Sequence, residues 1–244
     1  MSSYNYFARF YDDLTQNVEY EKRVEYLKSF LKQNNNKTVL DLACGTGSMS
    51  LPLLCDGYRV IGLDFSEDML EIASNKFSRV SDNFSLIKAD MRSFELSETV
   101  GACICTLDSI NHLNDINDVK KCFKCVYNSL DNNSVFIFDV NTKYKHNKIL
   151  SGNTFVFDED EYYVVWDNED EGNDEVRILL DMFVYNGSSY DRYSEEFFEK
   201  AYSVDELYDS LKNVGFKNIC VYDELTKSKP VDNSERIYFI CEKE

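Results

Sequence analysis

The sequence predicts an α/β protein built on a doubly wound, parallel sheet, and three observations support this fold class. Apolar, strand-like runs alternate with helix-compatible segments across residues 38–139. The first run is followed by a loop with two glycines, Gly45 and Gly47. The next two runs end at or just before an acid, Asp64 and Asp90. Strands that alternate with helices pair in parallel and bind ligands beyond their carboxyl ends, where all four residues fall.

The elements follow in order from the N-terminus. Residues 4–31 are expected to be one helix with an apolar stripe formed by Val24, Leu27, Phe30 and Leu31. The asparagines at 34–36 predict a loop. The five predicted strands of the parallel sheet lie at residues 38–41, 60–64, 84–88, 101–106 and 134–139. Ahead of the fifth strand, apolar side chains recur at steps of three and four from Ile116 to Leu130, which predicts an amphipathic helix.

The pattern changes near Thr154, where β-prone runs occur at 155–157, 162–166, 176–180 and 181–185, divided by polar turns such as 167–173. This indicates an antiparallel insertion of about three or four strands. The predicted organisation is therefore a core of residues 1–153 and 200–244, with an insertion at 154–199 that we expect to cover the substrate. The acid-rich span 158–175 is either a solvated loop or a collar for a cationic substrate.

The core pattern returns with a helix that a capping box of Ser203 and Glu206 opens and Gly215 ends. Two further strands are expected at 217–222 and 236–241.

Composition restricts the partners. The formal net charge is −18 and the pI is near 4.5, which argues against nucleic acid, because affinity for phosphate backbones comes from Lys and Arg. No apolar run is long enough to span a membrane, and residues 1–5 lack the order of a signal peptide. We therefore expect a cytoplasmic protein that does not bind a membrane.

The eight cysteines are then expected to be reduced thiols. Cys103 and Cys105 lie in an apolar run and are expected in the core. Cys122 and Cys125 form a CxxC within a predicted helix, without a second pair. Because the chain has only two histidines, we expect no metal site.

The glycine loop points to a ligand of the nucleoside type. Glycine lets the backbone turn sharply and lets a ligand approach closely, and the N–H groups at the following helix start can face that ligand. Asp64 follows at about the interval at which a carboxylate meets ribose hydroxyls. A nicotinamide dinucleotide is less favoured, since Ser50 occupies the slot for the third glycine and Pro52 soon follows. A dehydrogenase also gives no role to Asp90.

This order of glycine loop, acid after the second strand and acid after the third resembles the class I S-adenosylmethionine-dependent methyltransferases. The segment Asp64-Phe65-Ser66-Glu67-Asp68-Met69-Leu70 is similar to the ribose-binding segment of that family. The resemblance covers nearly the whole chain and is most specific over residues 38–142. It implies a Rossmann-like sheet of seven strands that closes with an antiparallel C-terminal pair. The layout is similar to small-molecule methyltransferases of the glycine and sugar N-methylating type.

By this resemblance the cofactor is S-adenosyl-L-methionine. Asp64 would hold the ribose hydroxyls, Asp90 the adenine amino group, with Met91 beside the ring, and the two glycines would line the methionine part. The full expected set of cofactor-binding residues is Tyr11, Asp41, Ala43, Cys44, Gly45, Gly47, Asp64, Phe65, Met69, Asp90, Met91 and Thr106.

The acceptor is expected to meet the segment 106–112, just past the fourth strand, which borders the methyl group in similar enzymes. His112 and Asp108 are the candidate catalytic residues, and His112 has the ordinary pKa of a neutral-pH base. The alternative is that His112 or Asn111 only caps the next element. Asn141, after the fifth strand, is a further candidate for substrate contact, and Tyr4, Tyr11 and Tyr20 resemble aromatic lid residues.

The acceptor is expected to be a small molecule, methylated on nitrogen or oxygen. The only prolines are Pro52 and Pro230, so neither a Pro-Pro-aromatic loop nor a Pro-Cys nucleophile can be present. Residues 131–133 replace the family's usual Pro-Gly-Gly turn with Asp-Asn-Asn, and asparagine tolerates the left-handed conformation. Two other functions remain open: a non-catalytic sensor of the cofactor that binds a partner, and an oxidoreductase using NAD. The oligomeric state is not predicted.

Overall fold

The computed structural model describes residues 7–31 and 36–244. Its larger part is a seven-stranded sheet in the order β10-β11-β5-β4-β1-β2-β3. The strands are β1 (Thr38–Leu42), β2 (Arg59–Asp64), β3 (Phe84–Lys88), β4 (Val100–Cys105), β5 (Leu130–Asn141), β10 (Lys217–Asp223) and β11 (Arg236–Lys243). The first five pair in parallel, while β11 is antiparallel to both β5 and β10. The predicted fold class is confirmed.

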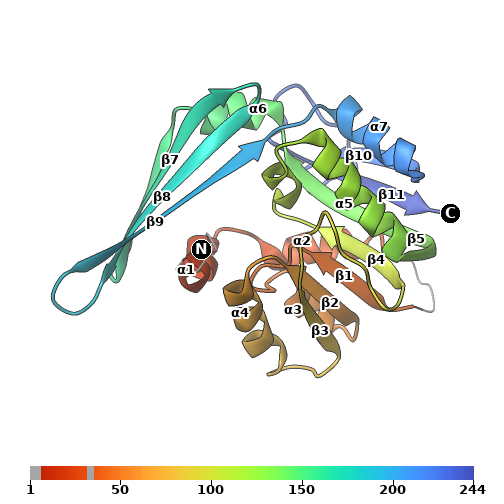
Figure 1. Cartoon of the computed structure of the whole chain (residues 1–244), viewed down its shortest axis with the longest axis horizontal. Coiled ribbons are helices and arrows are strands. Elements are labelled where there is room, and N and C mark those ends of the chain that lie inside the picture. The colour runs from red at the N-terminus through yellow and green to blue at the C-terminus, as the bar shows by residue number, and fades with distance from the viewer. Residues whose placement is uncertain (1–6, 32–35) are drawn as a thin grey trace.

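Helices cover both faces of this sheet (Figure 1). One face packs against α5 (Ile116–Ser129) and α7 (Val204–Val214), and the other against α2 (Tyr20–Lys28), α3 (Ser50–Cys55) and α4 (Glu67–Phe77). Side chains alternate across the strands, so that Leu40 of β1 enters the first layer and its neighbour Val39 the second. Cys103 and Cys105 are fully buried in the core, as predicted.

A second, four-stranded antiparallel sheet extends from the core as a long arm (Figure 1). Its strands are β6 (Thr154–Asp158), β7 (Tyr162–Gly172), β8 (Glu175–Tyr185) and β9 (Tyr190–Lys200). It is joined to β5 through α6 (Lys143–Lys145) and the helical turn η2 (His146–Leu150). Helix α1 (Phe7–Leu14) packs into the apolar face of this sheet, together with Met69 of α4 and Leu150. The N-terminal helix α1 and the four-stranded sheet therefore pack together on this side of the molecule, although they lie far apart in the sequence.

The expected boundaries within this sheet were wrong in three places. Residues 167–172 are strand rather than turn, because their partners on β8 continue the ladder and the turn itself occupies only Asn173 and Asp174, both with positive φ. Runs 176–180 and 181–185 form the single strand β8, and β9 was not predicted. The acid-rich span is consequently not a solvated loop: Asn168 is buried, and Glu169 pairs with Arg177 of the neighbouring strand.

The expected N-terminal helix is in fact two helices, α1 and α2, that are separated by residues 15–19. The Tyr11 carbonyl accepts both the backbone N–H and the hydroxyl of Thr15, and beyond Thr15 residues 16–19 are mainly polar and supply no apolar stripe to continue the helix. Tyr4 and the asparagines 34 and 35 lie outside the described residues. Asn133 has φ of 62°, as the left-handed turn requires, although it lies within β5.

The remaining predictions for the core agree with the structure. Helix α5 carries its buried side chains at the expected spacing. The capping box of Ser203 and Glu206 opens α7, and Gly215 ends it with φ of 124°. No helix among the described residues is both long enough and apolar enough to cross a membrane.

Candidate active site

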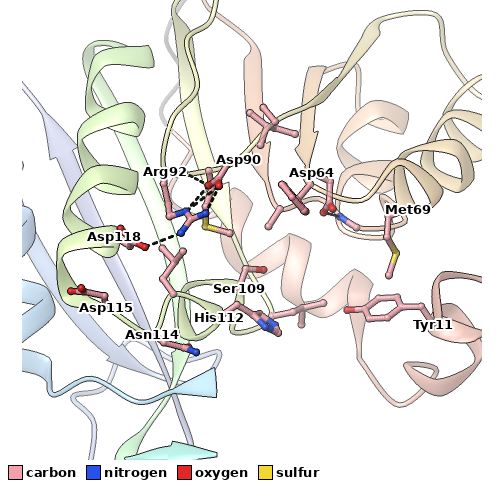
Figure 2. A pocket seen from close by; sticks show the side chains of 18 residues that line it. Tyr11, Asp64, Met69, Asp90, Arg92, Ser109, His112, Asn114, Asp115 and Asp118 are labelled. Carbon is pink, nitrogen blue, oxygen red and sulfur yellow. Dashed lines mark hydrogen bonds and ion pairs between the residues drawn. The ribbon is translucent and has the colours of Figure 1, made fainter. Parts of the chain in front are cut away.

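A cavity of about 570 Å³ opens at the carboxyl ends of the parallel strands (Figure 2). That volume is within the range of pockets that bind small ligands. Its walls come from the loops after β1, β2, β3 and β4, from α1 and from the start of α5. The residues that line it are Tyr11, Ala43, Gly45, Leu63, Asp64, Phe65, Met69, Ala89, Asp90, Met91, Arg92, Leu107, Ser109, His112, Leu113, Asn114, Asp115 and Asp118.

The glycine loop uses its two glycines for different purposes. Gly45 has φ of 53°, lines the cavity, and has open space where a Cβ would stand. Gly47, with φ of 78°, does not line the cavity, and a Cβ there would lie 2.4 Å from the ring of Phe77 on α4. Gly45 therefore lets a ligand approach the backbone, whereas Gly47 lets the loop pack closely on α4.

Asp64, the last residue of β2, is held in place by backbone donors. Its carboxylate accepts N–H bonds from Gly45 and from Ser66, each at 2.8 Å. Burial raises the pKa of Asp64, and these two N–H groups oppose that rise. Ser66 also caps α4 by accepting the N–H of Met69, another cavity residue. The carboxylate is thus fixed between the glycine loop and the start of α4 (Figure 2).

Asp90 lies at the other side of the cavity, where it is already paired. The Arg92 guanidinium bonds both oxygens of Asp90 and reaches Asp118 of α5 at 2.8 Å. These side-chain bonds from Arg92 hold the pKa of Asp90 below its ordinary value. This arrangement fixes the orientation of Asp90, and it was not expected from the sequence.

Two consecutive residues in the left-handed region, Leu107 and Asp108, turn the chain after β4. For side chains larger than glycine this conformation costs about 1–2 kcal/mol per residue, so it needs support. Both backbone N–H groups donate to Asp139 of β5 at 2.9 Å. Arg236 of β11 pairs with Asp139 and, at 3.1 Å, with Asp108. This buried ion network sets the position of the following turn, η1 (Ser109–His112).

His112 ends this turn and lines the cavity, with 33% of its side chain exposed. Its ring lies 5.3 Å from that of Phe197 on β9, and its Nε2 lies 3.8 Å from a carboxylate oxygen of Glu199. Burial lowers the pKa of His112, and the negative charge of Asp108 opposes that shift. The imidazole therefore favours its neutral form, which can accept a proton.

Helix α1 is attached to the glycine loop. Asp12 accepts the hydroxyls of Thr46 at 2.7 Å and Ser48 at 3.0 Å, and it pairs with Lys76 of α4 at 2.5 Å. These contacts hold the neighbouring Tyr11 over the cavity, as Figure 2 shows.

The structure brings most of the predicted cofactor residues together. Those that line the large cavity are Tyr11, Ala43, Gly45, Asp64, Phe65, Met69, Asp90 and Met91. Asp41, Cys44 and Thr106 line a small adjoining cavity of about 40 Å³, which Tyr20 also borders.

Three expected site residues lie elsewhere. Gly47 packs on α4, Asp108 belongs to the ion network, and Asn141 is buried with its amide donating to Asp108. Asn111 has the structural role that was its alternative, because it bonds the backbones of Asn141 and Lys200.

Sequence reasoning missed several residues of this site, including Arg92, Asp115, Asp118 and Glu199. A local signal exists for Asp115, since it directly precedes the amphipathic helix and caps α5. Glu199 has none, because it is one acid among several on an acidic strand.

Comparisons with known proteins agree with this architecture. The family model described as a methyltransferase domain matches residues 39–133. The chain is 33% identical over 243 residues to YqeM of Bacillus subtilis (strain 168), which has a provisional methyltransferase name; the match covers 98% of this chain and 97% of that protein.

Two further matches extend the comparison. A crystal structure of an S-adenosylmethionine-dependent methyltransferase from Clostridium acetobutylicum ATCC 824 superimposes with a TM-score of 0.87 at 34% identity, covering 99% of each chain. A glycine/sarcosine/dimethylglycine N-methyltransferase of Actinopolyspora halophila is 26% identical over 249 residues, which is 98% of this chain and 42% of that protein.

Proposed function

This chain belongs to the S-adenosylmethionine-dependent methyltransferases, and from that premise we propose that it methylates a nitrogen or oxygen atom of a small-molecule acceptor. One observation supports the proposal most directly. The cavity that receives the three family motifs continues past them to Tyr11 of α1 and to Ser109 and His112 in the segment after β4. A site of this size suits a small acceptor beside the cofactor rather than a polymer.

The residues present fit the cofactor. Gly45 offers an open backbone, and Asp64 presents a fixed carboxylate beside it. In our proposal Asp64 accepts the ribose hydroxyls, Asp90 and Met91 meet the adenine, and Ala43 with Gly45 borders the methionine part. Bound S-adenosylmethionine supplies a methyl group already activated by a positively charged sulfur.

The main task of the chain is then alignment. Holding the acceptor atom, methyl and sulfur in line can be worth roughly 7–11 kcal/mol of the barrier. Tyr11, Ser109 and His112 stand where the acceptor would lie, and their positions are fixed by the Asp12 contacts and by the Asp139 network. His112 can take a proton from the acceptor, which helps typically by about 10²–10⁴-fold when the nucleophile arrives protonated.

The nature of the relatives and the charge of the chain also favour a small acceptor. The Actinopolyspora protein is named for glycine, sarcosine and dimethylglycine, all small amines. The net charge of −18 disfavours nucleic acid as the substrate.

The test is turnover of a fractionated metabolite pool with methyl-labelled S-adenosylmethionine. Our proposal predicts label in a small-molecule fraction with the wild type and loss of that label with His112→Gln. The exposed substitution Glu98→Gln, at the opposite end of the sheet from the cavity, is the matched control. Calorimetry with S-adenosylmethionine and NAD should show heat only for the former. Binding without labelling of any fraction would instead indicate a sensor.

A further inference from the structure

The only two histidines of the sequence converge on one buried glutamate. His112 Nε2 lies 3.8 Å from one oxygen of Glu199, and His146 Nε2 lies 3.8 Å from the other. The three residues come from η1, η2 and β9, so three separate segments meet at this point. His112 faces the cavity, while Glu199 and His146 are buried, with 4% and 0% of their surface exposed.

The hydrogen bonding behind His112 is incomplete. His146 Nδ1 lies 3.2 Å from the carbonyl oxygen of Asp174, so Nδ1 is the protonated, donating nitrogen and Nε2 carries a lone pair. Among the described residues, neither that Nε2 nor the facing Oε2 of Glu199 has a hydrogen-bond partner. Two buried acceptors that face each other are costly, and a proton held between them would satisfy both. The cluster therefore has a place for one proton.

Charged groups surround the cluster on several sides. Asp108 of the turn after β4 and Asp174 of the β7–β8 turn bring negative charge, while Arg236 of β11 and Lys145 of α6 bring positive charge. Arg236 is already paired with Asp108 and Asp139. The positive and negative charges around Glu199 therefore partly cancel, and burial has the largest effect on the pKa of its carboxyl group.

We propose that Glu199, backed by His146, is a second proton site behind His112, and that the acceptor of this enzyme arrives as a protonated amine. This proposal rests on the proposed function and deepens it. Glu199 acts through His112 and does not touch the acceptor, so it is a positioning residue.

The proton balance is simple. Methylation of R–NH₃⁺ requires one N–H bond to break before the nitrogen pair attacks the methyl carbon; the carbon–sulfur bond then breaks and its electron pair stays on sulfur. One proton is released for each methyl transferred. His112 takes that proton at Nδ1 and passes its Nε2–H to the carboxylate of Glu199, which holds it until His112, partly exposed, returns it to water after product leaves.

The ionisation properties suit this role. Burial raises the pKa of Glu199 to about 8, and repulsion from Asp108 adds to the rise. Burial lowers the pKa of His146 to about 4, so this imidazole stays neutral and does not compete for the charge. A carboxyl group with a pKa near 8 becomes increasingly ionised as the pH rises through 8, so Glu199 is able to receive a proton from His112 on the alkaline side of neutrality.

The charges that line the cavity also favour an amine. Arg92 is the only Lys or Arg among the described lining residues, and it is bound to Asp90 and Asp118. A carboxylate on the acceptor would find no uncommitted lysine or arginine there. Asp115 is the lining carboxylate that neither Arg92 nor the cofactor engages in our proposal, so an ammonium group would meet its negative charge.

Imidazole NMR tests the cluster without any acceptor, because two histidines give two resolvable sets of signals. In the wild type with S-adenosylhomocysteine bound, the His112 signals should show a step near pH 8 as Glu199 ionises. Glu199→Gln, which keeps the shape of the side chain, should abolish that step. The matched control is Glu196→Gln on the same strand, where Glu196 is exposed and pairs with Arg177 at 3.5 Å; it should keep the step. A wild type without the step, or a folded Glu199→Gln variant with it, overturns the proposal.

Turnover of an identified amine tests the role in catalysis. Glu199→Gln should lower kcat by roughly 10²-fold while cofactor affinity stays within twofold, and the rising limb of kcat/KM should move to lower pH, because His112 alone is then the base. The pKa of the amine itself is the same for both proteins, so it cannot cause that movement. An unmoved limb or unchanged kcat contradicts the relay. Methylation of an oxygen acceptor would overturn the amine assignment and leave the proposed function standing.

Discussion

The two ends of the cavity are constructed in different ways. The end near Asp64 consists of short loops that follow consecutive strands, and backbone N–H groups hold its carboxylate. The end near His112 is assembled from η1, α1 and β9, which are distant in the sequence, and it depends on a buried ion network. The first kind of site is encoded locally, whereas the second exists only when the whole chain has folded.

The difference also separates the two tasks that we propose for the cavity, which are binding of the cofactor and transfer of its methyl group to the acceptor. A locally encoded site can bind the cofactor largely independently of the antiparallel sheet. In our proposal the acceptor end needs that sheet, since Phe197 and Glu199 both lie on β9. Changes to the sheet should therefore affect methyl transfer much more than cofactor binding.

The largest effect is expected when residues 154–199 are replaced by a flexible linker. The linker must join residues 153 and 200, at the opposite edges of the four-stranded sheet. These ends are three strand spacings apart across the sheet and about four residues apart along the strands, roughly 20 Å in all, so about ten Gly-Ser residues are needed. Methylation should be abolished, because Phe197 and Glu199 are lost, while cofactor affinity measured by calorimetry should stay within about tenfold, or 1.4 kcal/mol.

This replacement also uncovers the apolar side of α1, so thermal melting must show a cooperative transition. If the variant loses methylation only because α1 detaches, Asp12→Ala, which removes the bonds from α1 to Thr46, Ser48 and Lys76, should lose methylation to the same extent; we expect a smaller loss. A folded replacement that has lost the cofactor would show that the two ends are not separable.

Arg236→Met should have the next largest effect. It leaves Asp108 and Asp139 buried without their cation, and breaking a buried pair in this way costs about 3–5 kcal/mol. Chemical denaturation measures the loss in unfolding free energy. Arg59→Met is the matched control, because Arg59 pairs with Glu98 nearer the surface and such pairs contribute about 0–1 kcal/mol. Equal losses for the two variants would contradict the role of the network.

The two glycines of the loop should respond differently to alanine. Gly47→Ala adds a clash with Phe77, about 1–3 kcal/mol, to the left-handed strain of about 1–2 kcal/mol. Gly45→Ala carries only the strain, because nothing stands near its Cβ. Denaturation should therefore show the greater destabilisation for Gly47→Ala, and Phe77→Leu should partly rescue it. Rescue of Gly45→Ala by the same change would contradict the assignment.

Asp64→Ala should weaken cofactor binding by roughly one to two decades, since hydrogen bonds to a charged group carry about 1.5–3 kcal/mol. Calorimetry with S-adenosylmethionine measures this. Glu67→Gln, three residues further on, changes an exposed acid that pairs with Lys88 and should bind normally. Wild-type affinity in a folded Asp64→Ala protein would mean that another group holds the ribose.

The parts that could be predicted from the sequence are those encoded by local patterns. The glycine loop, Asp64 and the capping box of Ser203 were predicted because each belongs to a short sequence pattern: Ser203 and Glu206 are three residues apart, and Gly45 and Asp64, which bond to each other, end consecutive strand–loop units. The cross-strand partners that made residues 167–172 a strand are remote in sequence, so their polar composition was misleading.

The same limit applies at the acceptor end. His112 was found through its position after β4, but its partner Glu199 comes from a strand that was not predicted. Asp108 has the residue type and position of a catalytic acid, yet Arg236, 128 residues away, draws it into the ion network. Whether such a residue faces the cavity or joins a buried ion pair is decided by tertiary packing, which the local sequence does not show.

Hydrogen exchange with and without S-adenosylhomocysteine tests the separation of the two ends most directly, because it reports on every segment at once and needs no acceptor. Protection should concentrate in the loops after β1, β2 and β3, at residues 43–47, 64–69 and 89–92, with little change across β7, β8 and β9. Protection centred on the antiparallel sheet, with none around Gly45 and Asp64, would contradict the placement of the cofactor.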